Sequence, residues 1–132
     1  MGLTGTFPVS KKTKIIKTPL EIVFSKNSKL LQLKHNYKPE ILYGENYGYR
    51  SGLNPVMINH LRKKADFLKT KIKKKSQILD IGANDGTFLN FFNNKYNTFA
   101  IDPTLKKFGK FHKNTNRKIS ETFLKGIKKI RS

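Results

Sequence analysis

One stretch of nine residues, ILDIGANDG at 78–86, most constrains what this chain can fold into. Its apolar start is typical of a buried strand, and the glycines at 82 and 86 place a tight loop directly after it. Glycine has no Cβ and adopts positive φ readily, so such a loop lets the backbone approach a nucleotide-like ligand closely. The pattern predicts an α/β protein in which a strand at 77–81 leads through the loop into a helix at 87–94.

A carboxylate follows the second predicted strand, which we place at 97–101. Asp102 comes roughly 20 residues after the first strand, the distance at which βαβ nucleotide-binding folds place an acid on ribose hydroxyls. Dinucleotide enzymes carry G-x-G-x-x-G in the loop, whereas this chain carries D-x-G-x-x-x-G from Asp80 onward. Asn-Asp-Gly is also a common turn, so a purely structural connection is the alternative. The later acid favours a ligand site.

The chain has 132 residues, enough for one modest domain, and a formal net charge of +20. Such a charge favours nucleic-acid binding, with tyrosines as stacking platforms for bases. Only four of the 28 basic residues are arginine, however, and the lysines are spread along the whole chain, as on a solvated surface. We therefore expect non-specific nucleic-acid binding at low salt, and a basic nucleic-acid-binding protein remains an alternative function.

The sequence contains no cysteine, which excludes disulfides and thiolate metal sites. Its N-terminus has neither the charged start nor the long apolar core of a secretory signal. No apolar run approaches the roughly 20 residues that span a bilayer. We expect a cytoplasmic protein without a membrane partner.

Two segments precede the strand and loop. Residues 1–45 alternate basic stretches with strand-prone runs at 20–24 and 30–33, which predicts a small irregular β-containing subdomain. Residues 46–76 hold a Tyr/Gly-rich loop and a connecting helix that begins at Asn54–Pro55, an N-cap followed by proline. The Tyr/Gly-rich loop fits either a lid over a ligand or a packed connection.

The third segment, 77–132, carries the two predicted strands. After them we expect a loop at 106–116 and a last helix from Ser120. The connecting helix of the second segment has one apolar stripe, expected to dock on the sheet: Ile58, Leu61, Ala65, Leu68 and Ile72.

Four features occur together in one order: YGYRSG at 47–52, the helix after it, DIGANDGT at 80–87 and IDPT at 101–104. In this order and spacing, from about Gly5 to Phe111, the chain resembles the sugar C-methyltransferases that depend on S-adenosylmethionine (SAM). Those enzymes act on nucleotide-linked deoxysugars and carry an N-terminal zinc-binding domain. The resemblance implies a partial Rossmann-like class I SAM methyltransferase core, its first two βα units, preceded by the small β-containing subdomain.

The resemblance also implies an activity and site residues. SAM is the implied cofactor, and a carbon of a nucleotide-linked keto-deoxysugar is the implied methyl acceptor. Asp102 would bind the ribose hydroxyls. The methionine part of SAM would contact five residues of the first strand and loop: Asp80, Gly82, Ala83, Asn84 and Gly86. Three residues of the Tyr/Gly-rich loop would lie near the cofactor and the sugar: Tyr47, Tyr49 and Arg50.

The first departure from the family concerns zinc. Family members carry Cys-x-x-Cys pairs in the N-terminal domain, and the second pair falls on Ser25 and Ser28, while the first would precede Met1. Serine hydroxyls are poor zinc ligands, so zinc is not expected.

The second departure concerns catalysis. The family's general base lies in the part of the enzyme beyond this chain's last residue, so the catalytic residues are unknown. The three histidines, His35, His60 and His112, match no family base and are expected on the surface or in loops. Either a separate C-terminal catalytic chain supplies the base or the chain is an inactive methyltransferase remnant. A methyltransferase relative acting on another small molecule or on RNA also fits the loop, because a fold does not choose the acceptor.

Overall fold

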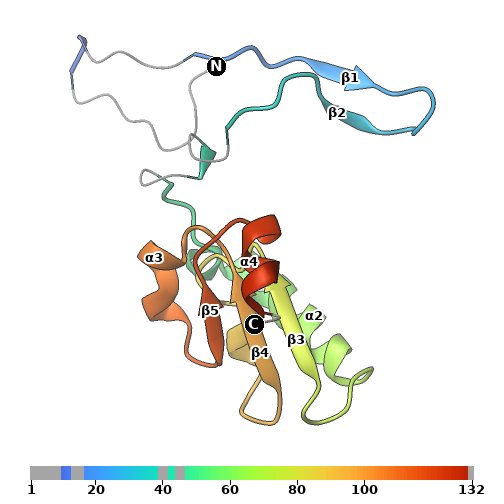
Figure 1. Ribbon diagram of the computed structural model, residues 1–132, viewed down its shortest axis with the longest axis vertical. Helices are drawn as coiled ribbons and strands as arrows, with labels where there is room; N and C mark the ends of the chain where they lie inside the picture. The colour runs from blue at the N-terminus through green and yellow to red at the C-terminus, as the bar shows by residue number, and fades with distance from the viewer. Residues whose placement is uncertain (1–9, 13–16, 39–41, 44–46, 131–132) are drawn as a thin grey trace. The chain divides into compact units, whose positions relative to one another are not determined.

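The computed structural model describes residues 10–12, 17–38, 42–43 and 47–130. The chain divides into two compact units, Met1–Gly48 and Tyr49–Ser132. It is a mixed α/β protein whose second unit contains a three-stranded parallel sheet with helices (Figure 1).

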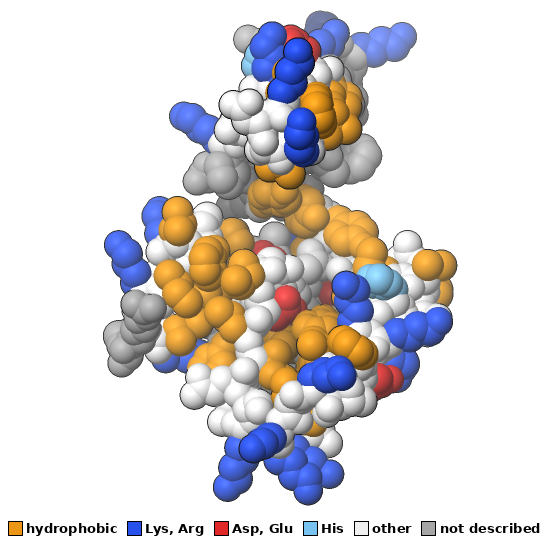
Figure 2. All heavy atoms as spheres, turned by 90° about the vertical axis from the view of Figure 1, so that its right-hand side faces the viewer, with side chains coloured by type: hydrophobic (Ala, Val, Ile, Leu, Met, Phe, Trp, Pro, Cys, Tyr) orange, Lys and Arg blue, Asp and Glu red, His pale blue; other side chains and the backbone are white. Residues whose placement is uncertain are grey.

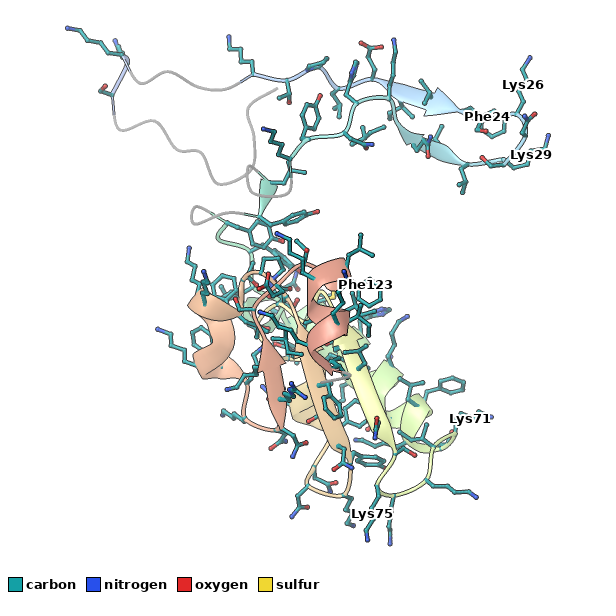
Figure 3. The ribbon with its side chains drawn as sticks, viewed as in Figure 1. Phe24, Lys26, Lys29, Lys71, Lys75 and Phe123 are labelled. Carbon is teal, nitrogen blue, oxygen red and sulfur yellow. The ribbon has the colours of Figure 1, made fainter. Side chains whose placement is uncertain are left out.

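The first unit contains an antiparallel hairpin of β1 (Ile22–Phe24) and β2 (Leu31–Leu33). The two strand-prone runs expected from the sequence form these strands. The connecting turn is closed by a hydrogen bond from the Lys29 amide to the Ser25 carbonyl, 2.8 Å, and Lys29 adopts a φ of 59°. Lys26 and Lys29 therefore lie at the tip of the hairpin (Figure 3).

The second unit is built on the strand order β3-β4-β5, with all neighbours parallel. β3 (Gln77–Ile81) and β4 (Asn97–Ile101) confirm the two strands predicted from the sequence. β5 (Arg117–Ile119) was not predicted, because only one of its three residues is apolar and its pairing with β4 is what orders it. β3 lies at an edge of this sheet.

Helices cover both faces of the sheet (Figure 1). α2 (Pro55–Lys69) begins as predicted: the Asn54 side chain accepts hydrogen bonds from the amides of the second and third helical residues. α4 (Phe123–Ile130) packs Gly126 closely against Ile101 of β4. Successive strand residues point to opposite faces, so Ala100 joins the core on the α2 side while Ile101 faces α4.

The core lies between the sheet and α2. Its buried members come from four elements and two connecting segments: Ala65, Ala83, Leu89, Phe92, Ala100 and Leu105. Phe92 contacts both Phe88 and Tyr96 edge to face, with ring centroids 5.3 and 5.5 Å apart. Of the apolar stripe expected on the connecting helix, Ala65 alone is fully buried, and Leu68 is exposed.

The prediction of a helix at 87–94 was wrong. The segment forms only a short 3-10 helix, η2 (Leu89–Phe91). The backbone is already extended at Phe92, and the Asn93 side chain then accepts a hydrogen bond from the Lys95 amide at 3.2 Å, a turn that competes with helix continuation.

The loop predicted at 106–116 was also wrong in its first half. α3 (Leu105–Phe108) and the 3-10 helix η3 (Gly109–Phe111) occupy it, and Leu105 and Phe108 are buried one turn apart. The last helix begins at Phe123 rather than at Ser120, whose hydroxyl instead donates a hydrogen bond to the Pro103 carbonyl. No helix among the described residues is long and apolar enough to cross a membrane.

Candidate functional site

The glycine loop follows β3 and has an unusual backbone. Gly82, Asn84 and Gly86 adopt φ values of 76°, 48° and 76°. A Cβ added to Gly82 would meet nothing within 4 Å, so position 82 requires glycine for its φ and leaves open space beside it. A Cβ on Gly86 would come within 2.5 Å of the His112 ring, so position 86 requires glycine for space as well.

Asp102 holds the loop against the end of β4. One of its carboxylate oxygens accepts a hydrogen bond from the Asn84 amide at 2.8 Å. The other accepts from the amide and the hydroxyl of Thr104, each at 2.6 Å. Asp102 is only 7% exposed. Three of about four acceptor positions are therefore used within the protein, which leaves about one for the ribose contact implied by the resemblance.

His112 supports the loop from another side and lies in the segment between η3 and β5, in agreement with the expectation that it lies on the surface or in a loop. Its side chain is buried, at 7% exposed, which the sequence did not predict. Its Nε2 lies 3.1 Å from the Asn84 carbonyl oxygen, so Nε2 carries the proton, and Nδ1 lies 3.0 Å from the Thr115 hydroxyl. Burial lowers the pKa of His112, against the opposite effect of the hydrogen bond to Asn84. The ring is therefore a neutral spacer beneath Gly86.

The segment 49–52 is fastened to the loop by side chains of Asn84 and Asp85. Asn84 accepts a hydrogen bond from the Ser51 amide and donates one to the Tyr49 carbonyl, both at 3.0 Å. Asp85 accepts from the Gly52 amide at 3.0 Å. The structure thus brings together two of the motifs on which the resemblance rests. Asp85, which is 1% exposed, is a residue whose role the sequence did not reveal.

Arg50 lies at the same junction. Its Nε is 3.3 Å from an Asp85 carboxylate oxygen, an ionic contact in which the N–H is not aimed well enough for a hydrogen bond. Its guanidinium lies 3.4 Å from the centroid of the Phe111 ring. Arg50 therefore braces the loop. Tyr49 belongs to the same unit and its side chain is partly exposed, whereas Tyr47 belongs to the first unit.

A pocket of about 230 Å³ opens beside the loop. Its lining comes from α2, β3 and the segments just described: Ser51, Leu61, Lys64, Asp80, Gly82, Ala83, Asn84, Thr87 and Phe88. Four residues implied for SAM binding are among them, and Gly86 and Asp102 are not. The volume is below the about 300–1,000 Å³ of complete small-molecule sites, so the pocket suits part of a ligand of SAM's size.

Asp80 is the acidic residue of this pocket. It points to the same sheet face as Ile78, toward α2, and its carboxylate makes no hydrogen bond or ion pair with any described residue. Burial, with a smaller contribution from the charge of Asp102, raises the pKa of Asp80 to about 6. Figure 2 shows acidic side chains recessed between hydrophobic ones on one face of the protein. A half-buried carboxylate without a protein partner can bind a ligand's cation.

The positions implied for zinc lie in the hairpin turn. Ser25 accepts a hydrogen bond from the Ser28 amide at 3.3 Å, so these serines close the turn. No group of three or more His, Asp or Glu side chains within the described ranges could hold a metal ion. Of the other two histidines, His35 pairs with Glu21 and His60 is exposed on α2.

Comparison of the sequence with models of known protein families finds no match, and comparison with curated proteins finds none either.

Proposed function

We propose that this chain is the SAM-binding part of a methyltransferase similar to the sugar C-methyltransferases, with a partial Rossmann-like core. The observation that carries the proposal is the unpartnered Asp80 carboxylate in a pocket beside a glycine loop. The loop backbone is open at Gly82 and fixed at Asn84 by Asp102 and His112. Such an arrangement binds a cationic, nucleotide-linked group at the carboxyl end of a parallel strand.

The residues present suit SAM by their chemistry. The Asp80 carboxylate matches the ammonium of the methionine part, and Leu61 and Phe88 offer apolar surface to its aliphatic chain. SAM, when bound, supplies an electrophilic methyl group on a sulfonium. The chain's own contribution is to bind and orient that group, because Asp102 and His112 keep the loop backbone in one geometry.

The methyl acceptor in this proposal is a nucleotide-linked keto sugar, which needs a base to form the attacking carbanion. His112 is not available as that base, since its Nε2 proton is donated to Asn84 and its Nδ1 contacts Thr115. We therefore propose that the base comes from outside the described residues, for example from a separate C-terminal catalytic chain. If no such base exists, the chain binds SAM but is an inactive methyltransferase remnant. Neither version of the proposal includes zinc.

A basic nucleic-acid-binding protein is the second candidate. It is favoured by the net charge of +20 and by the lysine-rich turn between α2 and β3. Figure 3 shows Lys71 and Lys75 on that turn, pointing away from the sheet. Lysines on an exposed turn are suited to phosphate contacts that are sensitive to salt and indifferent to sequence.

The test is calorimetric titration of the purified chain with S-adenosylhomocysteine (SAH), with amide NMR at moderate salt. We expect binding and shifts at Gly82, Asn84 and Gly86. Gly82→Ala should weaken binding roughly tenfold, because an L residue at this φ strains the loop.

Gly109→Ala is the matched control, since Gly109 is equally open but has a φ of −56°. A folded chain that ignores SAH would contradict the proposal. Salt-sensitive binding of a labelled single-stranded RNA that survives Gly82→Ala would support the second candidate instead.

A further inference from the structure

The pocket beside the glycine loop contains a second charge, of opposite sign to Asp80. Lys64 of α2 lines it, and no other lining residue is basic. No ion pair joins Lys64 to Asp80, and neither side chain has a hydrogen-bond or ion-pair partner among the residues that the structure describes. One pocket therefore presents an ammonium and a carboxylate, neither of which has a partner among the described residues.

Two of the other polar side chains of the pocket, Asn84 and Thr87, are already engaged. The Asn84 side chain bonds to the backbone at Ser51 and Tyr49. The Thr87 hydroxyl donates to Asp85 at 2.6 Å. The nearby guanidinium, Arg50, lies against Asp85 and the Phe111 ring and does not line the pocket. Lys64 and Asp80 are thus the side chains that remain for charge recognition.

A ligand that satisfies both must carry both signs a short distance apart. An α-amino acid head group does so, with its ammonium and its carboxylate on one carbon. Leu61 and Phe88 line the same pocket and suit an aliphatic side chain. The volume, about 230 Å³, fits a head group of this size rather than a whole nucleoside conjugate.

We propose that Lys64 and Asp80 together bind the zwitterionic head group of an α-amino acid. Asp80 accepts hydrogen bonds from the α-ammonium, and Lys64 donates to the α-carboxylate. The inference rests on the proposed function in that SAM and SAH carry such a head group. It adds Lys64, a residue of α2, to a site otherwise built from β3 and the loop.

The experiment compares two proteins, which differ at Lys64, with two ligands, which differ in the α-carboxylate. SAH and its decarboxylated analogue, which lacks only the α-carboxylate, are titrated calorimetrically into the wild type and into Lys64→Ala. We expect Lys64→Ala to weaken SAH about tenfold or more, the contribution of a charge-assisted hydrogen bond, and to leave the decarboxylated analogue unchanged.

Lys63→Ala is the matched control, because Lys63 is adjacent to Lys64 on α2 and is exposed as Lys64 is, but does not line the pocket. It should bind SAH as the wild type does. Lys64→Arg keeps a cationic donor and should retain most of the affinity. Alanine favours a helix, and a dispersed amide spectrum checks that each variant is folded.

Two further arms separate this inference from the proposed function. If SAH binds and Lys64→Ala behaves like Lys63→Ala, the inference is wrong and the proposed function stands. If SAH fails to bind but free methionine shifts Gly82 and Asn84, the amino-acid site stands and the methyltransferase proposal fails. Methylthioadenosine, which lacks the head group, should bind Lys64→Ala and wild type equally, and a loss with Lys64→Ala would overturn the assignment.

Discussion

The two sides of the glycine loop use the same kind of residue for opposite purposes. On one side, Asp85 and Asp102 are buried and accept hydrogen bonds from the Gly52, Asn84 and Thr104 amides. On the other side, Asp80 faces a pocket with no partner in the described part of the chain, and its pKa is raised to about 6. Burial alone therefore does not identify a binding carboxylate. A carboxylate that accepts several hydrogen bonds from the protein holds the fold, and a carboxylate that accepts none remains available to a ligand.

Among the variants that compare the two sides of the loop, Asp85→Ala is expected to change the free energy of unfolding most. The change removes acceptors for the Gly52 amide and for Thr87 and leaves the Arg50 Nε buried without its counter-charge. We expect a loss of about 3–5 kcal/mol in the free energy of unfolding, measured by urea titration with circular dichroism.

Asp66→Ala serves as its control, because Asp66 pairs with Lys69 on the exposed face of α2. That surface pair should contribute only about 0–1 kcal/mol. If the two variants unfold at the same urea concentration, Asp85 does not hold the loop.

Gly86→Ala tests the buried side of the loop by a steric clash rather than by removal of a charge. The added methyl group meets the buried His112 ring at 2.5 Å and forces a positive φ on alanine. We expect a destabilisation of about 2–4 kcal/mol from overpacking and backbone strain together. Gly109→Ala, where the surroundings are open and φ is negative, should leave the urea midpoint nearly unchanged.

Asp80→Asn tests the side of the loop that faces the pocket, and it should raise the free energy of unfolding where Asp85→Ala and Gly86→Ala lower it. The folded-state pKa of about 6 lies above the ordinary aspartate pKa of 3.8, so ionised Asp80 destabilises the ligand-free fold. That destabilisation is absent below about pH 4 and fully present above pH 6. At pH 7.5 the amide should stabilise the protein by at most about 3 kcal/mol while weakening SAH binding. A variant that is both less stable and weaker in binding would place Asp80 on the buried side.

The smallest effect concerns His112 and pH. Burial lowers its folded-state pKa, so the unfolded chain takes up a proton first as the pH falls below about 6.5, and stability declines there. Lys118 favours the neutral ring, whereas Asp85 and Asp102 oppose it. His112→Gln should flatten the decline between pH 7 and pH 5, since an amide can still donate to Asn84.

This measurement belongs in the Asp80→Asn background, because Asp80 stabilises the fold as the pH falls over the same range. Equal slopes for Asp80→Asn with and without His112→Gln would show that His112 does not titrate on unfolding.

Much of the scaffold could be predicted because its signals are local. An apolar run marks β3, and Asn54 before a proline marks the start of α2. β5 could not be predicted, since its order comes from pairing with β4 and not from its own residues. The helix expected after the loop did not form: its apolar residues are buried by a short 3-10 helix, after which the chain is extended at Phe92 and turns at Asn93.

The site divides in the same way. The glycine loop and Asp102 follow from spacing along the sequence, and the structure does join them. His112 and Lys64 could not be identified, because each reaches the site from a distant segment and neither stands in a local pattern. Asp85 lay within the recognised motif, but its contact with Gly52 links positions 33 residues apart.

The long sequence separation of these contacts has a consequence for how the loop is held. The hydrogen bonds to Asn84 close chain loops of 18 to 35 residues. Closing these loops costs conformational entropy, and only the contacts of the fully folded second unit together offset that cost. A peptide covering 77–102 alone would lack Tyr49, Ser51 and His112 and would not hold the loop. Hydrogen exchange at the Asn84 amide should therefore proceed only through global unfolding, so that its protection reports the stability of the whole second unit.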